Sequence, residues 1–400
     1  MKIAIIGGGA AGFMAAITAK SSDSSAEVVL FEKSDKVLSK VKISGGGRCN
    51  VTHACFNISE LTKHYPRGKK FLKKSFAHFY TKDTVDWFEE RGVKLKIEDD
   101  KRMFPDTNSS QSIIDCLMGA CTSSGVSLNL KSTVKSVLPQ KDKFILKVNE
   151  DEIAVDRLII ATGGSPKLHG LKWLIDLNYE VEKPVPSLFT FNMPNESIKE
   201  LMGVVATDVS VHIQGNKLKH TGPLLITHWG MSGPAILKCS AWGARELAHT
   251  DYRFNIQLNW ANLSENDYVN LIKEHKNSNR IIANKNPFNL PNRLWLFLLK
   301  KIHIDSNISW NQLDKKSGNR LLNVLFNDSY QVNGKTTFKE EFVTCGGISL
   351  NQVNPQSLES KKHKGLYFCG EVLDIDGVTG GFNFQSAWTT GYLAGKNSVL

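Results

Sequence analysis

The sequence predicts an α/β fold in which a parallel-sheet domain is interrupted by a β-rich insert that itself carries helices. Three observations lead to this prediction. A glycine-rich turn follows the first apolar run at Ile3–Ile6. Similar glycine-rich turns return from about residue 343 to the end of the chain. Between them, from 188 onward, the pattern changes to short strands and then to polar helices, so we expect the first and last segments to form one discontinuous domain.

The pattern of residues 2–33 is strand, tight turn, helix, strand and acid. The apolar run Ile3–Ile6 leads into GGGAAG at 7–12, and a small-residue segment follows. A second apolar run, Val28–Phe31, then ends on Glu32. A signal peptide is the alternative, since a lysine precedes the first run, but three consecutive glycines interrupt the apolar stretch. The whole pattern favours a dinucleotide-binding turn of the Rossmann type.

Each part of this motif has a physical role at a dinucleotide diphosphate. Gly7 permits the tight turn, Gly9 lets the backbone approach the diphosphate, and Gly12 lets the helix pack closely on the strand. The N-terminus of the helix adds N–H groups and the positive end of the helix dipole. Glu32 lies twenty residues past Gly12, where a carboxylate accepts hydrogen bonds from a ribose 2′-hydroxyl.

Composition and charge narrow the class of protein. The 400 residues are 41% hydrophobic and 22% charged, which is typical of a globular protein with two or three domains. No apolar run reaches the length of about 18 residues that a membrane-spanning helix needs, so no membrane segment is expected. Seven cysteines without a C-x-x-C pair indicate a reducing compartment, and we expect a cytoplasmic protein. The net charge of +11 suits an anionic cofactor or substrate and leaves nucleic acid as a partner to consider.

Two helices are expected in the first segment, at 71–91 and 111–124. The buried face of the first would consist of five aromatic residues, namely Phe71, Phe76, Phe79, Trp87 and Phe88. A basic block without acids runs from 63 to 74 and holds Lys63, Arg67, Lys69, Lys70, Lys73 and Lys74. We interpret this block as a solvated helix face rather than a binding surface.

Strands and further glycine turns follow in the same segment. Apolar patterns predict strands at 128–130, 134–138 and 144–148. The buried strand 158–161 breaks at Thr162-Gly163-Gly164, a second strand-end turn of the kind that borders a cofactor in an open α/β sheet. The SGGGRCN segment at 44–50 holds three consecutive glycines, which are costly in a helix, so we expect its backbone to pass close to a bulky group.

The insert begins after two prolines at 184 and 186. Its expected strands are 189–191, 204–213, 224–227 and 252–259, and one helix is expected from Pro234, a residue suited to a first helical turn. Residues 263–327 are polar, mildly basic and helical, and 330–342 return as a strand.

The C-terminal block favours a flavin over a nicotinamide as the bound dinucleotide. A strand ends at Gly370-Glu371, and a glycine turn at Gly380-Gly381 leads into a last helix that ends near Lys396. A nicotinamide dehydrogenase has no use for this second helix start, whereas FAD is long and its isoalloxazine lies far from its adenine. The positive helix end would face the flavin pyrimidine edge, where negative charge accumulates on reduction. A plain loop-to-helix connection is the alternative. No second GxGxxG occurs, so a reductase with two separate Rossmann domains is not expected.

Motifs spread over nearly the whole chain carry a family resemblance. They are GGGAAG at 7–12, Glu32-Lys33, Lys40, SGGGRCNVT at 44–52, Arg102 with Phe104-Pro105, ATGG at 161–164, THWGMSGPAIL at 227–237, VTCGG at 343–347 and GEVLDIDGVTGGFNFQ at 370–385. Together they resemble the bacterial YhiN-like flavoproteins, the family that includes aminoacetone oxidase and the BaiN-type bile-acid reductase. The last motif is the most specific of the set.

The resemblance implies three domains and a non-covalently bound FAD. The domains are a Rossmann-like FAD-binding domain of 1–187 and 343–400, similar to one half of glutathione reductase, a β-barrel-like insert of 188–262 and 328–342, and a small helical domain of 263–327. The implied cofactor-binding residues are Gly7, Gly9, Ala10, Ala11, Gly12, Glu32, Lys33, Lys40, Gly47, Arg48, Cys49, Val134, Thr162, Gly163, Gly370, Glu371, Gly381, Phe382 and Asn383. The chain departs from the family pattern at Cys345, at His53 and in a short SPKLHG segment at 165–170, which leaves the substrate open.

Arg48 is the first candidate for chemistry, because a fixed cation near the flavin N1–C2 edge stabilises the charge of the reduced form. A clamp on a phosphate or carboxylate is the alternative role. Cys49 has no C-x-x-C partner, so we favour packing for it, as for Cys345 and Cys369. His228 lies at a strand end before a glycine turn and is the candidate for proton exchange with substrate, with a purely structural role as the alternative. Weaker candidates are His53, Arg102 and Trp229, while Phe382 and Phe384 are more typical of a core.

The predicted function is that of an FAD-dependent oxidoreductase that exchanges hydride between flavin N5 and a small organic substrate. Two chemistries fit: reduction of an activated double bond with NADH or NADPH as donor, and oxygen-dependent oxidation of an amine or alcohol. The alternatives are a flavin redox sensor and a nucleic-acid-associated flavoprotein. The last is suggested by basic residues of the helical segment, namely Lys300, Lys301, Lys315, Lys316 and Arg320. The sequence contains no metal-ligand cluster and leaves the oligomeric state open.

Overall fold

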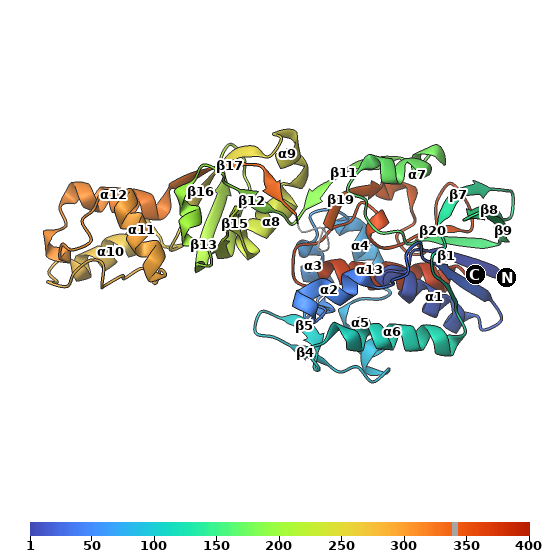
Figure 1. Cartoon of the computed structure of the whole chain (residues 1–400). Coiled ribbons are helices and arrows are strands. Elements are labelled where there is room, and N and C mark those ends of the chain that lie inside the picture. Colours follow the sequence, from blue (N-terminus) through green and yellow to red (C-terminus); the bar gives the residue numbers. More distant parts are fainter. Residues whose placement is uncertain (338–342) are drawn as a thin grey trace. The chain divides into compact units, whose positions relative to one another are not determined.

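The computed structural model describes residues 1–337 and 343–400 (Figure 1). The chain forms two compact units. Unit 1 comprises Met1–Ser187 and the described part of Phe338–Leu400, and unit 2 is Leu188–Thr337.

A five-stranded parallel sheet forms the centre of unit 1, with the strand order β20-β10-β1-β2-β6. The strands are β20 (Leu366–Phe368), β10 (Arg157–Ile160), β1 (Lys2–Ile6), β2 (Glu27–Phe31) and β6 (Ser127–Asn129). Ile5 of β1 is level with Leu30 of β2 and Ile159 of β10, and all three side chains are fully buried. Strands covered on both faces need continuous apolar runs, which is why the sequence marks them clearly. The predicted Rossmann-like α/β sheet is confirmed.

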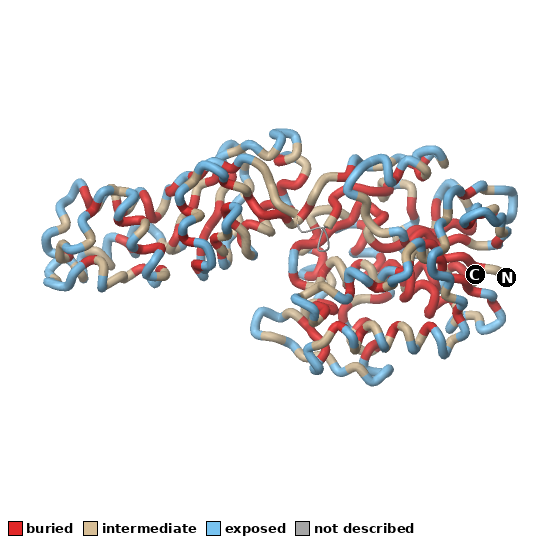
Figure 2. The backbone as a smooth tube through the Cα atoms, viewed as in Figure 1, coloured by how far each residue is buried: buried red, intermediate tan, exposed pale blue. Residues whose placement is uncertain are grey.

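Two helices from opposite ends of the chain pack together beside this sheet (Figure 1). These are α1 (Ala10–Ser22) and α13 (Phe382–Asn397). A Cβ atom on Gly391 would lie 2.5 Å from the Ala11 carbonyl oxygen, and one on Gly395 would lie 2.3 Å from that of Ala15. The residue numbers rise together along the contact, so the helices are parallel. Buried residues of unit 1 gather around this helix pair and the sheet (Figure 2).

The parallel packing sets the spacing of the two helix starts. Gly391 is nine residues past the first residue of α13, whereas Ala11 is one residue past that of α1. At a rise of 1.5 Å per residue, α13 therefore begins about 12 Å before the level at which α1 begins. Two positive helix ends thus face the same direction at different depths, as an elongated anionic cofactor requires.

The other elements of unit 1 complete the domain. They are α2 (Ser39–Gly47), β3 (Thr52–His53), α3 (Ile58–Leu61), α4 (Lys69–Ser75), α5 (Thr81–Glu89), β4 (Leu95–Ile97), β5 (Arg102–Pro105), α6 (Ser110–Ser124), β7 (Val134–Pro139), β8 (Phe144–Val148), β9 (Asp151–Val155), α7 (Lys172–Asp176), β11 (Val181–Ser187) and β19 (Val343–Ile348). Strands β7, β8 and β9 form an antiparallel meander between β6 and β10, and β11 pairs with β19 where the chain leaves and re-enters the unit.

The single helix predicted over 71–91 is wrong, because the chain forms two helices, α4 and α5, with a break between them. Tyr80 is extended at the break, with φ −139° and ψ −160°, and its N–H donates to the Asp83 carboxylate at 2.8 Å. This cap starts a new helix where the aromatic spacing alone suggests continuity. The five aromatic residues of the predicted buried face are all buried.

Unit 2 contains a seven-stranded antiparallel sheet in the order β17-β16-β13-β14-β15-β12-β18. Its strands are β12 (Thr190–Asn192), β13 (Val205–Ile213), β14 (Lys219–Ile226), β15 (Gly230–Ser232), β16 (Arg253–Asn259), β17 (Asp328–Asn333) and β18 (Lys335–Thr336). Strands β17 and β18 stand at opposite ends of this order, yet only Gly334 separates them along the chain. The sheet must therefore curl until its ends meet, and this confirms the predicted barrel-like insert. Of the strand predicted at 330–342, residues 338–342 lie outside the described part.

The helices of unit 2 share one hydrophobic core with its strands. They are α8 (Pro234–Trp242), α9 (Ala244–His249), α10 (Glu265–His275), α11 (Asn292–Lys301) and α12 (Lys315–Phe326). Figure 1 shows α10, α11 and α12 grouped at one end of the unit. The core includes Phe191 of β12, Trp295 of α11 and Leu321 of α12. A separate helical domain of 263–327 stays a prediction. In the described residues, we find no helix long and apolar enough to cross a membrane.

Candidate active site

The glycine turn after β1 leaves one open position at the start of α1. Gly7 has φ +115°, and a Cβ atom there would lie 2.4 Å from the Ala161 carbonyl oxygen. A Cβ atom on Gly12 would lie 1.9 Å from the Gly7 carbonyl oxygen, so this turn tolerates only glycine. A Cβ atom on Gly9, by contrast, would meet no described heavy atom within 4 Å. Since no side chain caps α1 at Gly9, its first N–H groups face the space predicted for the diphosphate.

Glu32 links this turn to the second strand. Its Oε2 accepts a hydrogen bond from the Gly8 N–H at 2.8 Å, and its Oε1 accepts from the Ser34 N–H and hydroxyl, both at 2.9 Å. An ionised carboxylate has about four acceptor positions, so one remains for a ribose hydroxyl. Ser132 N–H donates to the Glu32 carbonyl at 2.9 Å, which brings the segment leading to Val134 beside the same residue. Lys33, next to Glu32, is exposed.

We expect Glu32→Ala to lower FAD affinity by about one to two decades, because it removes a charge-assisted hydrogen bond worth about 1.5–3 kcal/mol. Glu32→Gln is the matched control, since it keeps the size and one acceptor oxygen and should lose less. Fluorescence titration of the apoprotein with FAD measures both affinities. Equal affinity in all three proteins would mean that the ribose is held elsewhere.

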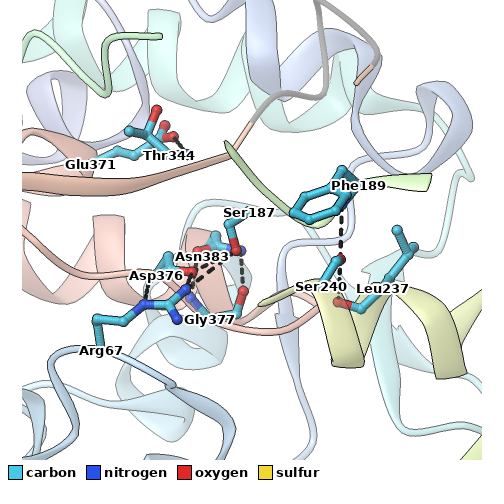
Figure 3. A network of polar contacts seen from close by, with 10 residues as sticks. All are labelled: Arg67, Ser187, Phe189, Leu237, Ser240, Thr344, Glu371, Asp376, Gly377 and Asn383. Atoms are coloured by element: carbon cyan, nitrogen blue, oxygen red, sulfur yellow. Dashed lines mark hydrogen bonds and ion pairs between the residues drawn. The ribbon is translucent and has the colours of Figure 1, made fainter. Parts of the chain in front are cut away.

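A buried hydroxyl near the start of β19, beside the turn that follows β10, is unsatisfied. Thr344 Oγ1 is buried and has no hydrogen-bond partner in the described residues, and it lies next to Gly164. The Thr344 N–H donates to Glu371 at 2.8 Å (Figure 3). Lys40 forms an ion pair with the other oxygen of Glu371 at 2.6 Å. Buried hydroxyls normally have a partner. A polar atom of a bound FAD would supply one, so the residues present fit this cofactor.

The SGGGRCN segment meets the start of α13. The backbone leaves the helical conformation at 44, and Gly45, Gly46 and Gly47 are all left-handed. In the amide orientation that satisfies all its atoms, Asn50 accepts from the Gly381 N–H at 2.9 Å. His53 Nδ1 lies 3.1 Å from the Gly380 carbonyl oxygen. Two of the predicted glycine motifs are therefore one structural element, and the start of α13 has no side-chain cap.

Arg48 is held between an acid and an aromatic ring. Its Nη1 lies 2.5 Å from Glu98 Oε1, and its guanidinium carbon lies 4.0 Å from the centre of the Phe104 ring. Arg102 also reaches Glu98, at 3.6 Å, but its Nε pairs with Asp100 at 2.6 Å, so these two arginines face two carboxylates. Cys49 is fully buried, and burial raises the pKa of its thiol to about 12. A neutral thiol is a poor nucleophile, in agreement with packing.

Two of the predicted cofactor-binding residues, Phe382 and Asn383, make contacts within the protein, and their role toward FAD stays a prediction. Phe382 is buried, and its ring stacks on His64 with the centres 4.2 Å apart. The Asn383 amide accepts from the Gly377 N–H at 2.8 Å and donates to the Gly377 carbonyl at 3.0 Å, which fixes the loop before the helix.

His228 belongs to unit 2, where it is exposed on the turn between β14 and β15, and its ring centre lies 4.7 Å from that of Trp229.

Sequence reasoning missed a buried ion pair in the loop that precedes α13. Asp376 is fully buried, and Arg67 binds both of its carboxylate oxygens (Figure 3). Ser187 Oγ donates to the same carboxylate at 2.6 Å. The interpretation of the basic block as a solvated face is therefore wrong for Arg67. It holds for the exposed lysines of α4, which are Lys69, Lys70, Lys73 and Lys74.

A parallel sheet with a glycine turn, an acid at the end of β2 and a second uncapped helix start fit an FAD-binding domain of the Rossmann type, the class of the FAD-dependent oxidoreductases. A family model described as the HI0933-like protein Rossmann domain matches residues 1–397. The chain therefore belongs to the HI0933-like protein family, and the resemblance found in the motifs is confirmed.

Curated relatives cover almost the whole chain. A ribosomal RNA dihydrouridine synthase of Escherichia coli (strain K12) is 30% identical over 99% of this chain and 97% of its own length. A protein of the same name from Haemophilus influenzae is 29% identical over 97% of this chain and 96% of its own length. A 3-dehydro-bile acid delta(4,6)-reductase of Clostridium scindens is 26% identical over 99% and 98%.

Solved structures show the fold. A 3-ketosteroid-delta4-(5alpha)-dehydrogenase from Rhodococcus jostii RHA1 aligns with all of this chain and 96% of its own, at a TM-score of 0.52 and 11% identity. A 3-ketosteroid delta1-dehydrogenase from Sterolibacterium denitrificans aligns over 99% of both chains, at a TM-score of 0.51 and 10% identity.

Proposed function

We propose that this protein reduces the C5–C6 double bond of a uridine in ribosomal RNA, with NADPH or NADH as electron donor. The observation that carries the proposal is 30% identity to a ribosomal RNA dihydrouridine synthase over 99% of this chain. The net charge of +11 agrees with an RNA substrate. We place the reaction in the cytoplasm, a reducing compartment that agrees with the cysteine content of the chain.

The chemistry of uridine fits the electrostatics of the site. Its double bond is conjugated to the C4 carbonyl, so hydride addition at C6 moves negative charge to O4, and a proton must then reach C5. When bound, FAD supplies the hydride. The uncapped start of α13 offers N–H donors, and Arg48 adds a cation that Glu98 and the Phe104 ring hold in place. We assign Arg48 to charge stabilisation and His228, exposed on its turn, to proton delivery.

Arg48 has a measurable consequence for the bound flavin. Arg48→Ala should lower the reduction potential, because it removes a cation and leaves the charge of Glu98 less compensated, and Arg48→Lys should lower it less. For this two-electron couple, about 30 mV corresponds to about 1.4 kcal/mol, which a dye-coupled titration resolves. Both variants should still bind oxidised FAD. An unchanged potential with weaker FAD binding would assign Arg48 to a clamp instead.

Anaerobic stopped-flow mixing tests the proposed function. The holoenzyme is first mixed with NADPH or NADH, and loss of the yellow flavin absorbance reports reduction. The reduced enzyme is then mixed with uridine-containing ribosomal RNA, with oxygen or with a steroid dienone. Rapid return of the colour with RNA supports the proposal. Loss of the colour when the oxidised enzyme is mixed with an amine, followed by a rapid return with oxygen, would favour an oxidase. No reduction by either nucleotide or by the amine would favour a sensor.

A further inference from the structure

Helix α12 carries an open hollow lined by three basic residues and two asparagines. The hollow has a volume of about 520 Å³ and is lined by Lys315, Lys316, Asn319, Arg320 and Asn323. Each of these side chains carries N–H groups, and none is a carboxylate. The opposite side of the helix buries Leu321, Val324 and Leu325 in the core of unit 2. The helix is thus anchored by one side and presents cations on the other.

Helix stability does not account for these cations. Lys315 and Lys316 occupy the first turn, where the positive end of the helix dipole disfavours lysine, and no acid lies in that turn. Asp314 precedes them, but its carboxylate caps the helix by accepting from the Ser317 N–H at 2.7 Å. A negatively charged ligand over this turn would offset the repulsion between the dipole and the lysines.

Arg320 retains a donor without a partner. Its Nη2 donates to Ser317 Oγ at 2.9 Å, while its Nε is buried and has no partner in the part of the chain that the structure describes. Lys301, another basic residue of this unit, differs: it pairs with Asp328 at 2.5 Å and lies over the Tyr330 ring. Lys301 is therefore used within the fold, whereas Lys315, Lys316 and Arg320 line the hollow.

We infer that the α12 hollow binds phosphate groups of the RNA backbone and positions the RNA whose uridine is reduced. The inference rests on the proposed function, which supplies RNA as the substrate. Phosphate oxygens accept only, and they match a lining of ammonium, guanidinium and amide donors. Such contacts set position rather than sequence, so binding should be similar for RNAs of different sequence.

The test compares two triple variants that remove equal charge. The first is Lys315→Gln, Lys316→Gln and Arg320→Gln on α12. The control is Lys69→Gln, Lys70→Gln and Lys73→Gln on the exposed face of α4 in unit 1. Fluorescence anisotropy with a short labelled RNA hairpin measures affinity at several salt concentrations. Thermal unfolding and FAD content check that each variant folds.

The α12 variant should bind the hairpin at least about tenfold more weakly, and its slope of log affinity against log salt should fall by about 2 to 3. The α4 variant should change little in either quantity. Equal losses in both would mean that total charge alone matters, and no loss in the α12 variant would overturn the inference. Heparin, a polyanion, gives a second test. If heparin displaces the hairpin from the wild type but binds the α12 variant as tightly as the wild type, the anion site lies elsewhere and the inference is overturned.

Failure of the inference is separable from failure of the proposed function. If the wild type binds RNA through α12 but forms no dihydrouridine, the proposed function fails and the phosphate site stands. If dihydrouridine forms equally fast with the α12 variant at low RNA concentration, the phosphate site fails and the proposed function stands.

Discussion

Arg67→Ala is expected to destabilise unit 1 by about 3–5 kcal/mol at neutral pH, because it leaves a buried carboxylate without its cation. Asp376 is fully buried, and in the variant Ser187 would be its remaining donor among the contacts described above. Ser187 ends β11 and Arg67 precedes α4, so the pair ties two segments to the loop before α13. Urea unfolding followed by circular dichroism measures the loss.

The loss should shrink as the pH falls. Burial raises the pKa of Asp376, and Arg67 acts in the opposite direction. Without Arg67 the folded-state pKa rises further, so the folded protein takes up a proton at a pH where the unfolded chain does not. The variant should therefore regain stability relative to the wild type as the pH falls from neutral towards the unfolded value of 3.8.

The double variant Arg67→Ala with Asp376→Asn is the matched control. It removes the buried charge as well as its partner, so it should be more stable at neutral pH than Arg67→Ala alone, and its stability should vary less with pH. If both variants lose the same stability with the same pH dependence, the ion pair is not the cause.

Two glycine substitutions in one turn should both weaken FAD binding, but for different reasons. Gly12→Ala places a Cβ atom 1.9 Å from the Gly7 carbonyl oxygen, a backbone clash that must move α1 or the turn. Overpacking of this kind costs about 1–3 kcal/mol, so the variant should be less stable and colourless. Gly9→Ala meets no described protein atom within 4 Å, so the apoprotein should keep its stability.

The added methyl group of Gly9→Ala instead enters the space predicted for the diphosphate. Its FAD affinity should fall by about tenfold or more, which corresponds to about 1.4 kcal/mol or more. Differential scanning calorimetry of the apoproteins and FAD titration separate the two effects. A Gly9→Ala variant with wild-type affinity would place the diphosphate elsewhere, and a fully stable Gly12→Ala apoprotein would contradict the close packing of the turn.

Local patterns make the sheet and its glycine turns predictable. Strands buried on both faces read as apolar runs, and Gly7 and Gly12 stand where only glycine fits. The curled sheet of unit 2 is predicted, but β15 is not, because a strand of three residues that contains a glycine carries little signal. The break before α5 depends on a cap between Tyr80 and Asp83 that aromatic spacing does not reveal.

Contacts between distant residues set the limit of the sequence prediction. Arg67 and Asp376 are 309 positions apart, and Arg67 lies in a block that reads as solvated lysines. The place of Arg48 after three glycines makes it a candidate, but its pairing with Glu98 comes from a neighbouring loop and has no local signature. The sequence shows which residues are charged and how they are spaced, whereas the fold determines which charged residues form pairs.

Nucleoside mass spectrometry of ribosomal RNA tests the central claim most directly. The holoenzyme is incubated with NADPH and an unmodified ribosomal RNA transcript, and the RNA is then digested to nucleosides. We expect a nucleoside heavier than uridine by two hydrogen atoms, formed only when NADPH is present and strongly reduced with Gly9→Ala. Suppose that no such nucleoside forms, although NADPH reduces the enzyme and a steroid dienone reoxidises it. The protein is then a flavin-dependent reductase that acts on a substrate other than ribosomal RNA.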